Sequence, residues 1–244
     1  MSTIARERWP ELDAEATIRA GHIWVDGFPR TNPAMRVARD ASIVLRTPQP
    51  LAGEAKLRAA LDAFAPRIAD RVAIDVGAAA GGFTRVLLEA GARRVYAIDA
   101  GFGQLLGSLR QDPRVVNLER TNLGELDVAR VPQTIDIVTI DVSYISLARA
   151  VPQLGGLAFA PDAELIALVK PMFELALAEA PDDDESLANA LARASTGIAE
   201  AGWDVVAAIP SPVRGHHGAK EQLVHARRIA GSRSTDPLGA ASKI

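Results

Sequence analysis

The sequence predicts an α/β protein in which a doubly wound, mostly parallel sheet carries an antiparallel hairpin at one edge. A small α+β domain precedes this sheet in the chain. Short apolar runs alternate with helical patterns over most of the sequence, which is typical of parallel strands joined by helices. Two strand-like runs near the end have no room for a helix between them, so we expect them to form an antiparallel hairpin. The start of the chain has its own helix, strand and turn pattern.

The small first domain is expected at residues 1–46. Within it, "ATIRAGHIWVDG" predicts a short helix that ends at Gly21 and an alternating strand that leads into a turn at Asp26-Gly27. A second alternating stretch, "ASIVLR", closes the domain. Residues 47–55, "TPQPLAGEA", contain two prolines and a glycine and are expected to form a linker.

The second domain is expected at residues 56–230. Its first helix is expected to begin at Lys56. The predicted strands are 71–77, 93–101, 114–119, 135–143, 163–170, 203–211 and 221–228. The predicted helices between them lie at 81–91, 104–111 and 182–202. Residues 231–244 are polar and rich in small side chains, so they are expected to form a disordered tail.

The composition indicates a protein of the cytoplasm without a membrane partner. The chain has 244 residues, a formal net charge of -3 and no cysteine. Disulfides, thiolate metal sites and cysteine nucleophiles are therefore excluded. No run approaches the roughly 20 apolar residues of a membrane span, and the first residues lack the apolar core of a signal peptide. His216 and His217 are adjacent but have no clustered ligands beside them, so no metal site is expected.

A glycine loop follows the first predicted strand of the second domain. In "AIDVGAAAGGFT", Gly77, Gly81 and Gly82 allow a tight turn and bring the backbone close to a ligand at a helix N-terminus. The spacing differs from the dinucleotide fingerprint, and no lysine of the phosphate-binding loop follows. The alternative is a turn that only packs strand against helix.

Two carboxylates narrow the choice of ligand. Asp75 ends the strand before the loop, where it would repel a pyrophosphate but accept an ammonium group. Asp99 ends the next strand, where an acidic side chain can accept hydrogen bonds from both hydroxyls of a ribose. A ligand with a ribose, a positive charge and no phosphate is S-adenosylmethionine.

Longer motifs then give a family resemblance. They are "AIDVGAAAGGFT", "VYAIDAGFGQLLGSLRQDPRVVNLERTN", "DIVTIDVSYISL", "ALVKPMFE", "IPSPVRG" and "KEQLVHAR". Together they resemble class I methyltransferases and, within that class, the FtsJ-like ribose methyltransferases of the TlyA (haemolysin A) family. The resemblance implies a Rossmann-like methyltransferase sheet. Through "IRAGHIWVDG" and "RVARDASIVL" the first domain resembles the S4 fold, a small RNA-binding domain.

The resemblance also implies a catalytic tetrad of Lys56, Asp141, Lys170 and Glu221. Lys170 either deprotonates the ribose hydroxyl or steers it. To act as a base it must lose its own proton, which burial and Lys56 favour and which Asp141 and Glu221 oppose; the sequence leaves this open. Each residue also has an ordinary alternative: a solvated lysine, a helix-capping aspartate, a surface pair between Lys170 and Glu174, or an edge-strand charge.

The remaining site residues follow from the same resemblance. The expected contacts to S-adenosylmethionine are Asp75, Gly77, Gly81, Gly82, Phe83, Asp99, Asn122 and Asp141. The expected contacts to RNA are Arg19, His22, Arg36, Arg214 and Lys220.

The implied function is 2'-O-methylation of ribosomal RNA, at a cytidine, by a monomer. Three segments depart from the family pattern: the first domain has a short first helix interrupted at Pro10, and two segments that are usually basic are replaced by "TPQPLAGEA" and "LALAEAPDDDES". The second replacement is acidic, which disfavours a nearby phosphate backbone. The alternatives are therefore a methyltransferase for another RNA or a small molecule, and an RNA-binding protein without catalysis.

Overall fold

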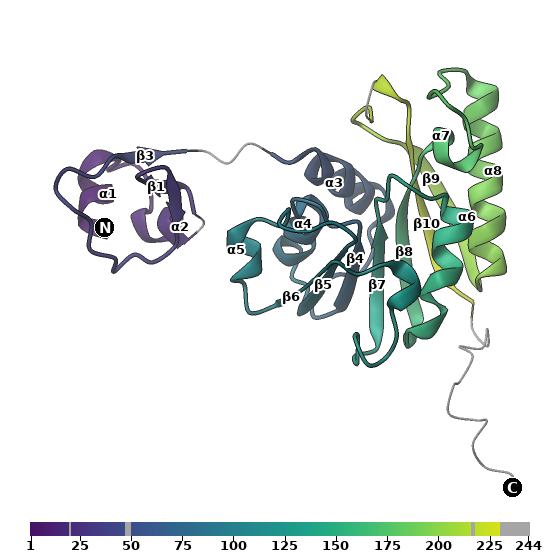
Figure 1. The fold of residues 1–244 in the computed structure, drawn as a ribbon, viewed down its shortest axis with the longest axis horizontal. Coiled ribbons are helices and arrows are strands. Elements are labelled where there is room, and N and C mark those ends of the chain that lie inside the picture. The colour runs from purple at the N-terminus through teal and green to yellow at the C-terminus, as the bar shows by residue number, and fades with distance from the viewer. Residues whose placement is uncertain (20, 47–49, 216–217, 230–244) are drawn as a thin grey trace, which may run out of the picture. The chain divides into compact units, whose positions relative to one another are not determined.

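The computed structural model describes residues 1–19, 21–46, 50–215 and 218–229. Its contacts divide the chain into two compact units, Met1–Pro50 and Leu51–Ile244 (Figure 1). The tail expected at 231–244 and the pair His216-His217 lie outside the described residues.

The first unit is a small α+β fold. Its elements are α1 (Ser2–Arg8), α2 (Ala14–Arg19), β1 (Ile23–Val25), β2 (Phe28–Arg30) and β3 (Ile43–Leu45). The strands form an antiparallel sheet in the order β2-β1-β3, and Ile18 of α2 and Ile23 of β1 are completely buried in the core of this unit. Asp26 and Gly27 both adopt positive φ, 51° and 83°, in the tight turn between β1 and β2, as the sequence predicts.

The second unit contains a seven-stranded sheet with the order β6-β5-β4-β7-β8-β10-β9. Its strands are β4 (Val72–Val76), β5 (Arg94–Asp99), β6 (Val115–Glu119), β7 (Ile135–Ile140), β8 (Phe159–Val169), β9 (Trp203–Pro210) and β10 (Gln222–Arg228). Strands β4 to β8 pair in parallel, whereas β10 runs antiparallel to both β8 and β9. The predicted fold class, a doubly wound sheet with an antiparallel edge hairpin, is confirmed.

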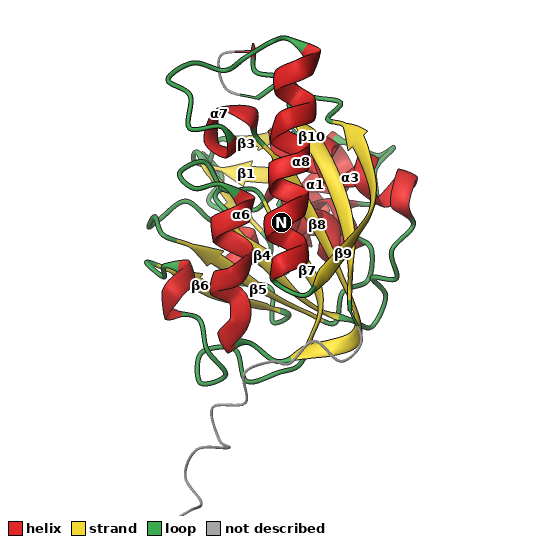
Figure 2. Ribbon diagram, turned by 90° about the vertical axis from the view of Figure 1, so that its right-hand side faces the viewer, coloured by secondary structure: helices red, strands yellow, loops and turns green. Residues whose placement is uncertain are grey.

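Helices cover both faces of this sheet. They are α3 (Ala52–Phe64), α4 (Gly82–Glu89), α5 (Gly107–Arg110), η1 (Leu123–Glu125), α6 (Leu147–Ala150), η2 (Val151–Gly156), α7 (Pro171–Glu174) and α8 (Asp184–Glu200). One apolar core joins the sheet to α3 and α4, and another joins it to α6, η2 and α8. Figure 2 shows α6 and α8 crossing the near face of the strands. As expected for an acidic helix start, Asp183 caps α8 by accepting a hydrogen bond from the Ser186 amide, at 2.7 Å.

Two local predictions are corrected, and one helical stretch was not predicted. Helix α3 begins at Ala52 rather than at Lys56, so the end of the expected linker is helical; Glu54 holds this start by accepting from the Leu51 amide at 3.3 Å. The helix expected at 104–111 has only four residues, because a carboxylate from β6 ties down the preceding backbone. The helical stretch from Leu147 to Gly156 was not predicted.

Candidate active site

An open cavity of about 340 Å³ lies where β4, β5 and β7 end. Carboxyl ends of parallel strands are the usual ligand-binding edge of such a sheet. The cavity is lined by Val76, Gly77, Ala79, Ile98, Asp99, Ala100, Gly101, Gln104, Thr121, Leu123, Asp141, Val142, Ser143 and Tyr144. Of the residues expected to contact a cofactor, Gly77, Asp99 and Asp141 are in this lining.

The glycine loop forms one wall of the cavity. Gly77 has a φ of 83°, and a Cβ atom there would lie 2.4 Å from the backbone oxygen of Asp141, so only glycine fits. Gly81 and Gly82 lie outside the lining and serve packing instead. A Cβ on Gly81 would lie 2.2 Å from Leu109, and one on Gly82 would lie 3.1 Å from the backbone of α3.

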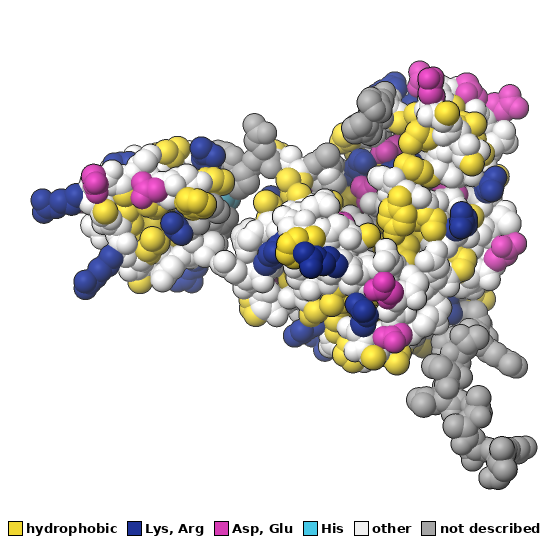
Figure 3. Space-filling view, viewed as in Figure 1, with side chains coloured by type: hydrophobic (Ala, Val, Ile, Leu, Met, Phe, Trp, Pro, Cys, Tyr) yellow, Lys and Arg dark blue, Asp and Glu magenta, His cyan; other side chains and the backbone are white. Residues whose placement is uncertain are grey.

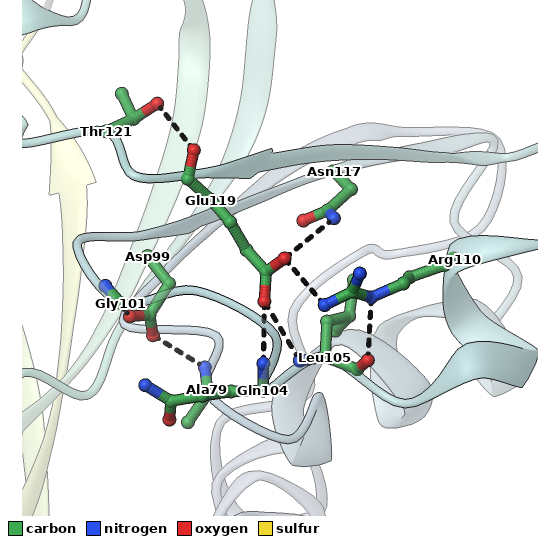
Figure 4. Close-up of polar contacts among 9 residues, drawn as sticks. All are labelled: Ala79, Asp99, Gly101, Gln104, Leu105, Arg110, Asn117, Glu119 and Thr121. Carbon is green, nitrogen blue, oxygen red and sulfur yellow. Dashed lines mark hydrogen bonds and ion pairs between the residues drawn. The ribbon is translucent and has the colours of Figure 1, made fainter.

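Asp99 connects the glycine loop to the loop that follows β5 (Figure 4). One carboxylate oxygen accepts from the Ala79 amide at 2.8 Å, and the other accepts from the Gly101 amide at 2.7 Å. Each carboxylate oxygen can accept more than one hydrogen bond, so Asp99 keeps acceptor capacity toward the cavity. Asp99, which the sequence predicts to bind a ribose, therefore lies in the cavity wall.

Glu119, at the end of β6, was missed by the sequence analysis. Its carboxylate accepts from the amides of Gln104 and Leu105, at 2.8 and 3.2 Å, and from Arg110 at 2.7 Å (Figure 4). Burial opposes its ionisation, but the hydrogen bonds from Asn117 and the backbone amides prevail and lower the pKa of Glu119 to about 2. A charged Glu119 thus holds the loop that carries Gln104 against the cavity. Its position at a strand end, like that of Asp99, was the available signal.

Asp75, Phe83 and Asn122 do not line the cavity. Asp75 is completely buried, and its carboxylate accepts from the hydroxyls of Thr84 and Thr139, at 2.6 and 2.9 Å. Burial raises the pKa of Asp75 to about 6, against the effect of these two bonds. Phe83 lies in the apolar core, and the Asn122 amide donates to Glu125. Asp75 therefore supports the loop from beneath.

The lining chemistry selects a class of ligand. Its ionisable side chains with negative charge are Asp99 and Asp141, and it contains neither lysine nor arginine. A pyrophosphate would meet the carboxylate of Asp99, and the lining itself offers it no cation. A ribose can instead bond to Asp99.

Four charged side chains from distant parts of the chain meet beside the cavity. The Nζ atom of Lys170 lies 2.6 Å from Oδ1 of Asp141, and the other oxygen of Asp141 lies 3.7 Å from Nζ of Lys56. Lys56 also contacts Glu221, at 2.7 Å. The side chains of Lys56 and Glu221 are only 8% and 5% exposed. The order in space is Lys170, Asp141, Lys56, Glu221.

The ordinary alternatives for the two lysines do not fit this geometry. Lys56 is buried in α3 rather than solvated. Lys170 bonds to Asp141 and to the hydroxyl of Ser143, at 2.6 Å, rather than to Glu174. Glu174 is itself buried and accepts from the Leu147 amide, and burial raises its pKa. Lys170 is thus held at the cavity edge by two residues that line the cavity.

The five residues expected to contact RNA lie in different settings. Lys220 and Arg214 each pair with Asp182, at 3.3 and 3.4 Å. Arg19 pairs with Glu15, Arg36 is exposed, and the backbone of His22 bonds to Thr17 in α2 and to Arg46 just after β3. The acidic segment noted in the sequence therefore partly neutralises the cations of the second unit.

The described residues contain neither a membrane-spanning helix nor a cluster of metal ligands. No helix among residues 1–19, 21–46, 50–215 and 218–229 is long and apolar enough to cross a membrane. In the same ranges no three histidine, aspartate or glutamate side chains are grouped so that they could hold a metal ion.

Comparison with known proteins shows which family the chain resembles. Residues 53–228 match the sequence model of the FtsJ-like methyltransferase family. The 16S/23S rRNA (cytidine-2'-O)-methyltransferase TlyA of Mycobacterium tuberculosis is 39% identical over 233 residues, which are 92% of this chain and 85% of that protein. Hemolysin A of Brachyspira hyodysenteriae is 32% identical over 230 residues, with coverages of 87% and 91%.

Solved structures show the same fold. A protein from Streptococcus thermophilus, named as a candidate hemolysin, superimposes with a TM-score of 0.70 and 30% identity over 88% of this chain and 82% of that one. An S-adenosylmethionine-dependent methyltransferase from Mesorhizobium loti gives a TM-score of 0.51 at 18% identity, over 70% of this chain and 96% of that one. The second likeness concerns the fold alone. From the family match over most of the second unit and the relatives that span both units, the chain belongs to the FtsJ-like methyltransferase family and, within it, to the TlyA (hemolysin A) proteins.

Proposed function

We propose that this protein transfers a methyl group from S-adenosylmethionine to a ribose 2'-hydroxyl of ribosomal RNA, at a cytidine. The observation that carries the proposal is the chain of ion pairs from Lys170 through Asp141 to Lys56 and Glu221, which reaches the cavity at Asp141. The choice of ribosomal RNA and cytidine is supported by the relative from Mycobacterium tuberculosis, whose name specifies both.

The cavity residues fit S-adenosylmethionine. Asp99 accepts hydrogen bonds from the ribose hydroxyls, and Gly77 permits close approach of the ligand. When bound, this cofactor supplies an electrophilic methyl group. The absence of lysine and arginine from the lining agrees with a ligand that has no phosphate.

The tetrad residues act on the substrate oxygen. Lys170 hydrogen-bonds to the 2'-hydroxyl and holds or moves its proton at Nζ, and it is positioned by Asp141 and Ser143. Asp141 balances both lysines. Lys56 and Glu221 fix Asp141 from the opposite side, because both are buried and their contact at 2.7 Å leaves Lys56 little freedom.

The RNA is held by residues outside the cavity. In this proposal the first unit acts as an S4-like RNA-binding module through Arg19, His22 and Arg36, and Arg214 and Lys220 contact the RNA near the tetrad. The protein works as a monomer in the cytoplasm, on RNA within ribosomal subunits.

A second candidate is methylation of a different RNA or of a small molecule. It is favoured by the pairing of Asp182 with Arg214 and Lys220, because an acidic segment at this place repels a phosphate backbone.

The test is transfer of labelled methyl groups. The native protein is incubated with labelled S-adenosylmethionine and, in separate reactions, unmodified ribosomal subunits, free ribosomal RNA and transfer RNA. The variant Lys170→Ala is assayed alongside. Arg93→Ala is the control, because it also removes one cation but from an exposed position near the opposite edge of the sheet. The proposal expects label in subunits with the native protein and Arg93→Ala but not with Lys170→Ala. Label confined to transfer RNA or to no RNA supports the second candidate.

A further inference from the structure

A second cavity, of about 530 Å³, opens between the first turns of α8 and the loop that joins β9 to β10. Its size lies within the usual range of ligand pockets, about 300 to 1,000 Å³. It is lined by Asp184, Leu187, Ala188, Leu191, Pro210, Ser211, Val213, Arg214, Lys220, Glu221 and Gln222. In Figure 3 the acidic side chains that precede and begin α8 gather at the top right of the view. No residue that lines this second cavity also lines the proposed cofactor cavity.

The walls combine apolar surface with unused hydrogen-bonding capacity. Leu187, Leu191 and Val213 provide apolar contacts. Gln222 provides the polar feature, because its side-chain oxygen is buried and has no hydrogen-bond partner in the described part of the chain. A buried polar atom without a partner destabilises the structure. A ligand that packs against the leucines and draws the Gln222 amide toward the cavity can donate to this oxygen and give it a partner.

The charges at the rim favour a neutral occupant. Arg214 and Lys220 are the cations of the lining, and both are paired with Asp182, at 3.4 and 3.3 Å. Lys220 also lies 3.8 Å from Asp184. Because the cations are already balanced by carboxylates, a phosphate gains little from entering. A planar, neutral group with donors and acceptors along its edge, which describes a nucleobase, satisfies both the apolar wall and Gln222.

The position of the cavity relates it to the tetrad. Glu221 lines the cavity, and its carboxylate contacts Lys56 at 2.7 Å. Gln222 pairs in the sheet with Val169, the residue before Lys170. A base in this cavity therefore lies beside the groups proposed to act on the ribose but outside the proposed cofactor cavity, with which it shares no lining residue.

We propose that this cavity binds the base of an unpaired nucleotide that adjoins the methylated one, an inference that rests on the proposed function. Binding of this base gives the enzyme part of its preference for RNA sequence or structure. When the neighbouring nucleotide is base-paired in a helix, its base cannot enter the cavity.

Direct binding tests the cavity without catalysis. Protein saturated with S-adenosylhomocysteine, which keeps nucleosides out of the first cavity, is titrated with free nucleosides, ribose 5-phosphate and inorganic phosphate. Two-dimensional NMR follows the side-chain amide of Gln222 and the backbone amides of Ser211 and Val213. Nucleosides are expected to shift all three, and Ala188→Trp is expected to abolish the shifts. Shifts with phosphate or ribose 5-phosphate alone, or none with any nucleoside, overturn the proposal.

A filled cavity tests its role in turnover. Ala188 is exposed on α8 and lines the cavity, so tryptophan there enters it without displacing the core. Ala192, one helical turn further and also exposed, is outside the lining and provides the control Ala192→Trp. Ala188→Trp is expected to lose about tenfold or more in kcat/KM for ribosomal subunits with unchanged affinity for S-adenosylmethionine. Native turnover by Ala188→Trp overturns the role of the cavity, whereas absent turnover by the native protein overturns the proposed function and leaves the NMR result to decide the cavity.

Discussion

The Nζ atom of Lys170 lies 2.6 Å from Oδ1 of Asp141, and the two side chains are only 12% and 20% exposed. Since the second oxygen of Asp141 faces Lys56 at 3.7 Å, one carboxylate serves two lysines. Removing any member of such a partly buried group leaves an uncompensated charge, which affects stability as well as chemistry. The predictions below separate these two effects.

The charges of Lys56 and Glu221 are predicted to be required for methyl transfer, whereas the stability of the fold needs only that neither charge is left without the other. Glu221→Leu should destabilise the fold by about 3 kcal/mol, because it leaves the Lys56 ammonium buried without its closest partner. The double variant Lys56→Met with Glu221→Leu should recover most of that stability, since no charge is then stranded. Methyl transfer should stay about 100-fold below native in both variants. Thermal unfolding and the labelled-methyl assay measure the two effects, and an active double variant would contradict the proposed role of the pair.

Gly215 is predicted to be required by the carboxylate of Glu221. A Cβ atom on Gly215 would lie 2.1 Å from Oε1 of Glu221, so Gly215→Ala must displace that carboxylate from Lys56. Methyl transfer should fall about tenfold or more while cofactor affinity is kept. Gly155→Ala is the matched control, because a Cβ there meets nothing within 4 Å. Equal activities of the two alanine variants would show that Glu221 can move without consequence.

Asp99 is predicted to determine cofactor affinity. Asp99→Asn places a side-chain NH2 donor against the donor N–H of Ala79 or Gly101. It also removes the negative charge that strengthens the hydrogen bonds from the ribose hydroxyls. Affinity for S-adenosylmethionine should fall about tenfold or more, as measured by titration calorimetry. Asp162→Asn, an exposed acid that pairs with Arg71, should bind the cofactor normally. Unchanged binding by Asp99→Asn would mean that the cofactor lies elsewhere.

Asp75 is predicted to destabilise the fold at neutral pH. Burial raises its pKa from 3.8 to about 6, so the folded protein binds this proton more tightly than the unfolded chain does. The stability contributed by the protonated form is complete below pH 3.8 and is lost as the pH rises through about 6. Asp75→Asn, which cannot ionise, should be more stable than native at neutral pH and less sensitive to pH between these values.

Asp112 provides a control, because its pKa is shifted in the opposite direction from that of Asp75. A side-chain bond from Arg114 lowers the pKa of Asp112, so its contribution is present above pH 3.8 and is lost as the pH falls below that value. Asp112→Asn should therefore be less stable at neutral pH. Denaturant unfolding across the pH range measures both variants, and a loss of stability in Asp75→Asn at neutral pH would refute the account of its burial.

Much of this fold follows from local patterns in the sequence. The apolar runs locate the strands of the second unit, and the Asp26-Gly27 signal marks a turn, because each depends on residues close in the chain. The convergence of Asp141 and Lys170 follows from the shared carboxyl edge of parallel strands.

The features that the sequence does not predict depend on contacts between distant segments of the chain. Asp75 and Asp99 both end strands, but only Asp99 faces the cavity, because Thr84 from α4 and Thr139 from β7 enclose Asp75. The role of Glu119 depends on a loop that folds back onto β6, and the start of α3 depends on Glu54, which also accepts from Arg85 at 2.6 Å. The pairing of Lys220 with Asp182 likewise joins two separate loops.

The most direct test of the central claim is the site of the methyl group on the RNA. Unmodified ribosomal subunits are treated with the native protein or with Lys170→Ala and labelled S-adenosylmethionine, and the RNA is digested to nucleosides for mass spectrometry. The account predicts labelled 2'-O-methylcytidine with the native protein and none with Lys170→Ala. Label on a base, or 2'-O-methylcytidine formed equally well by Lys170→Ala, would contradict it.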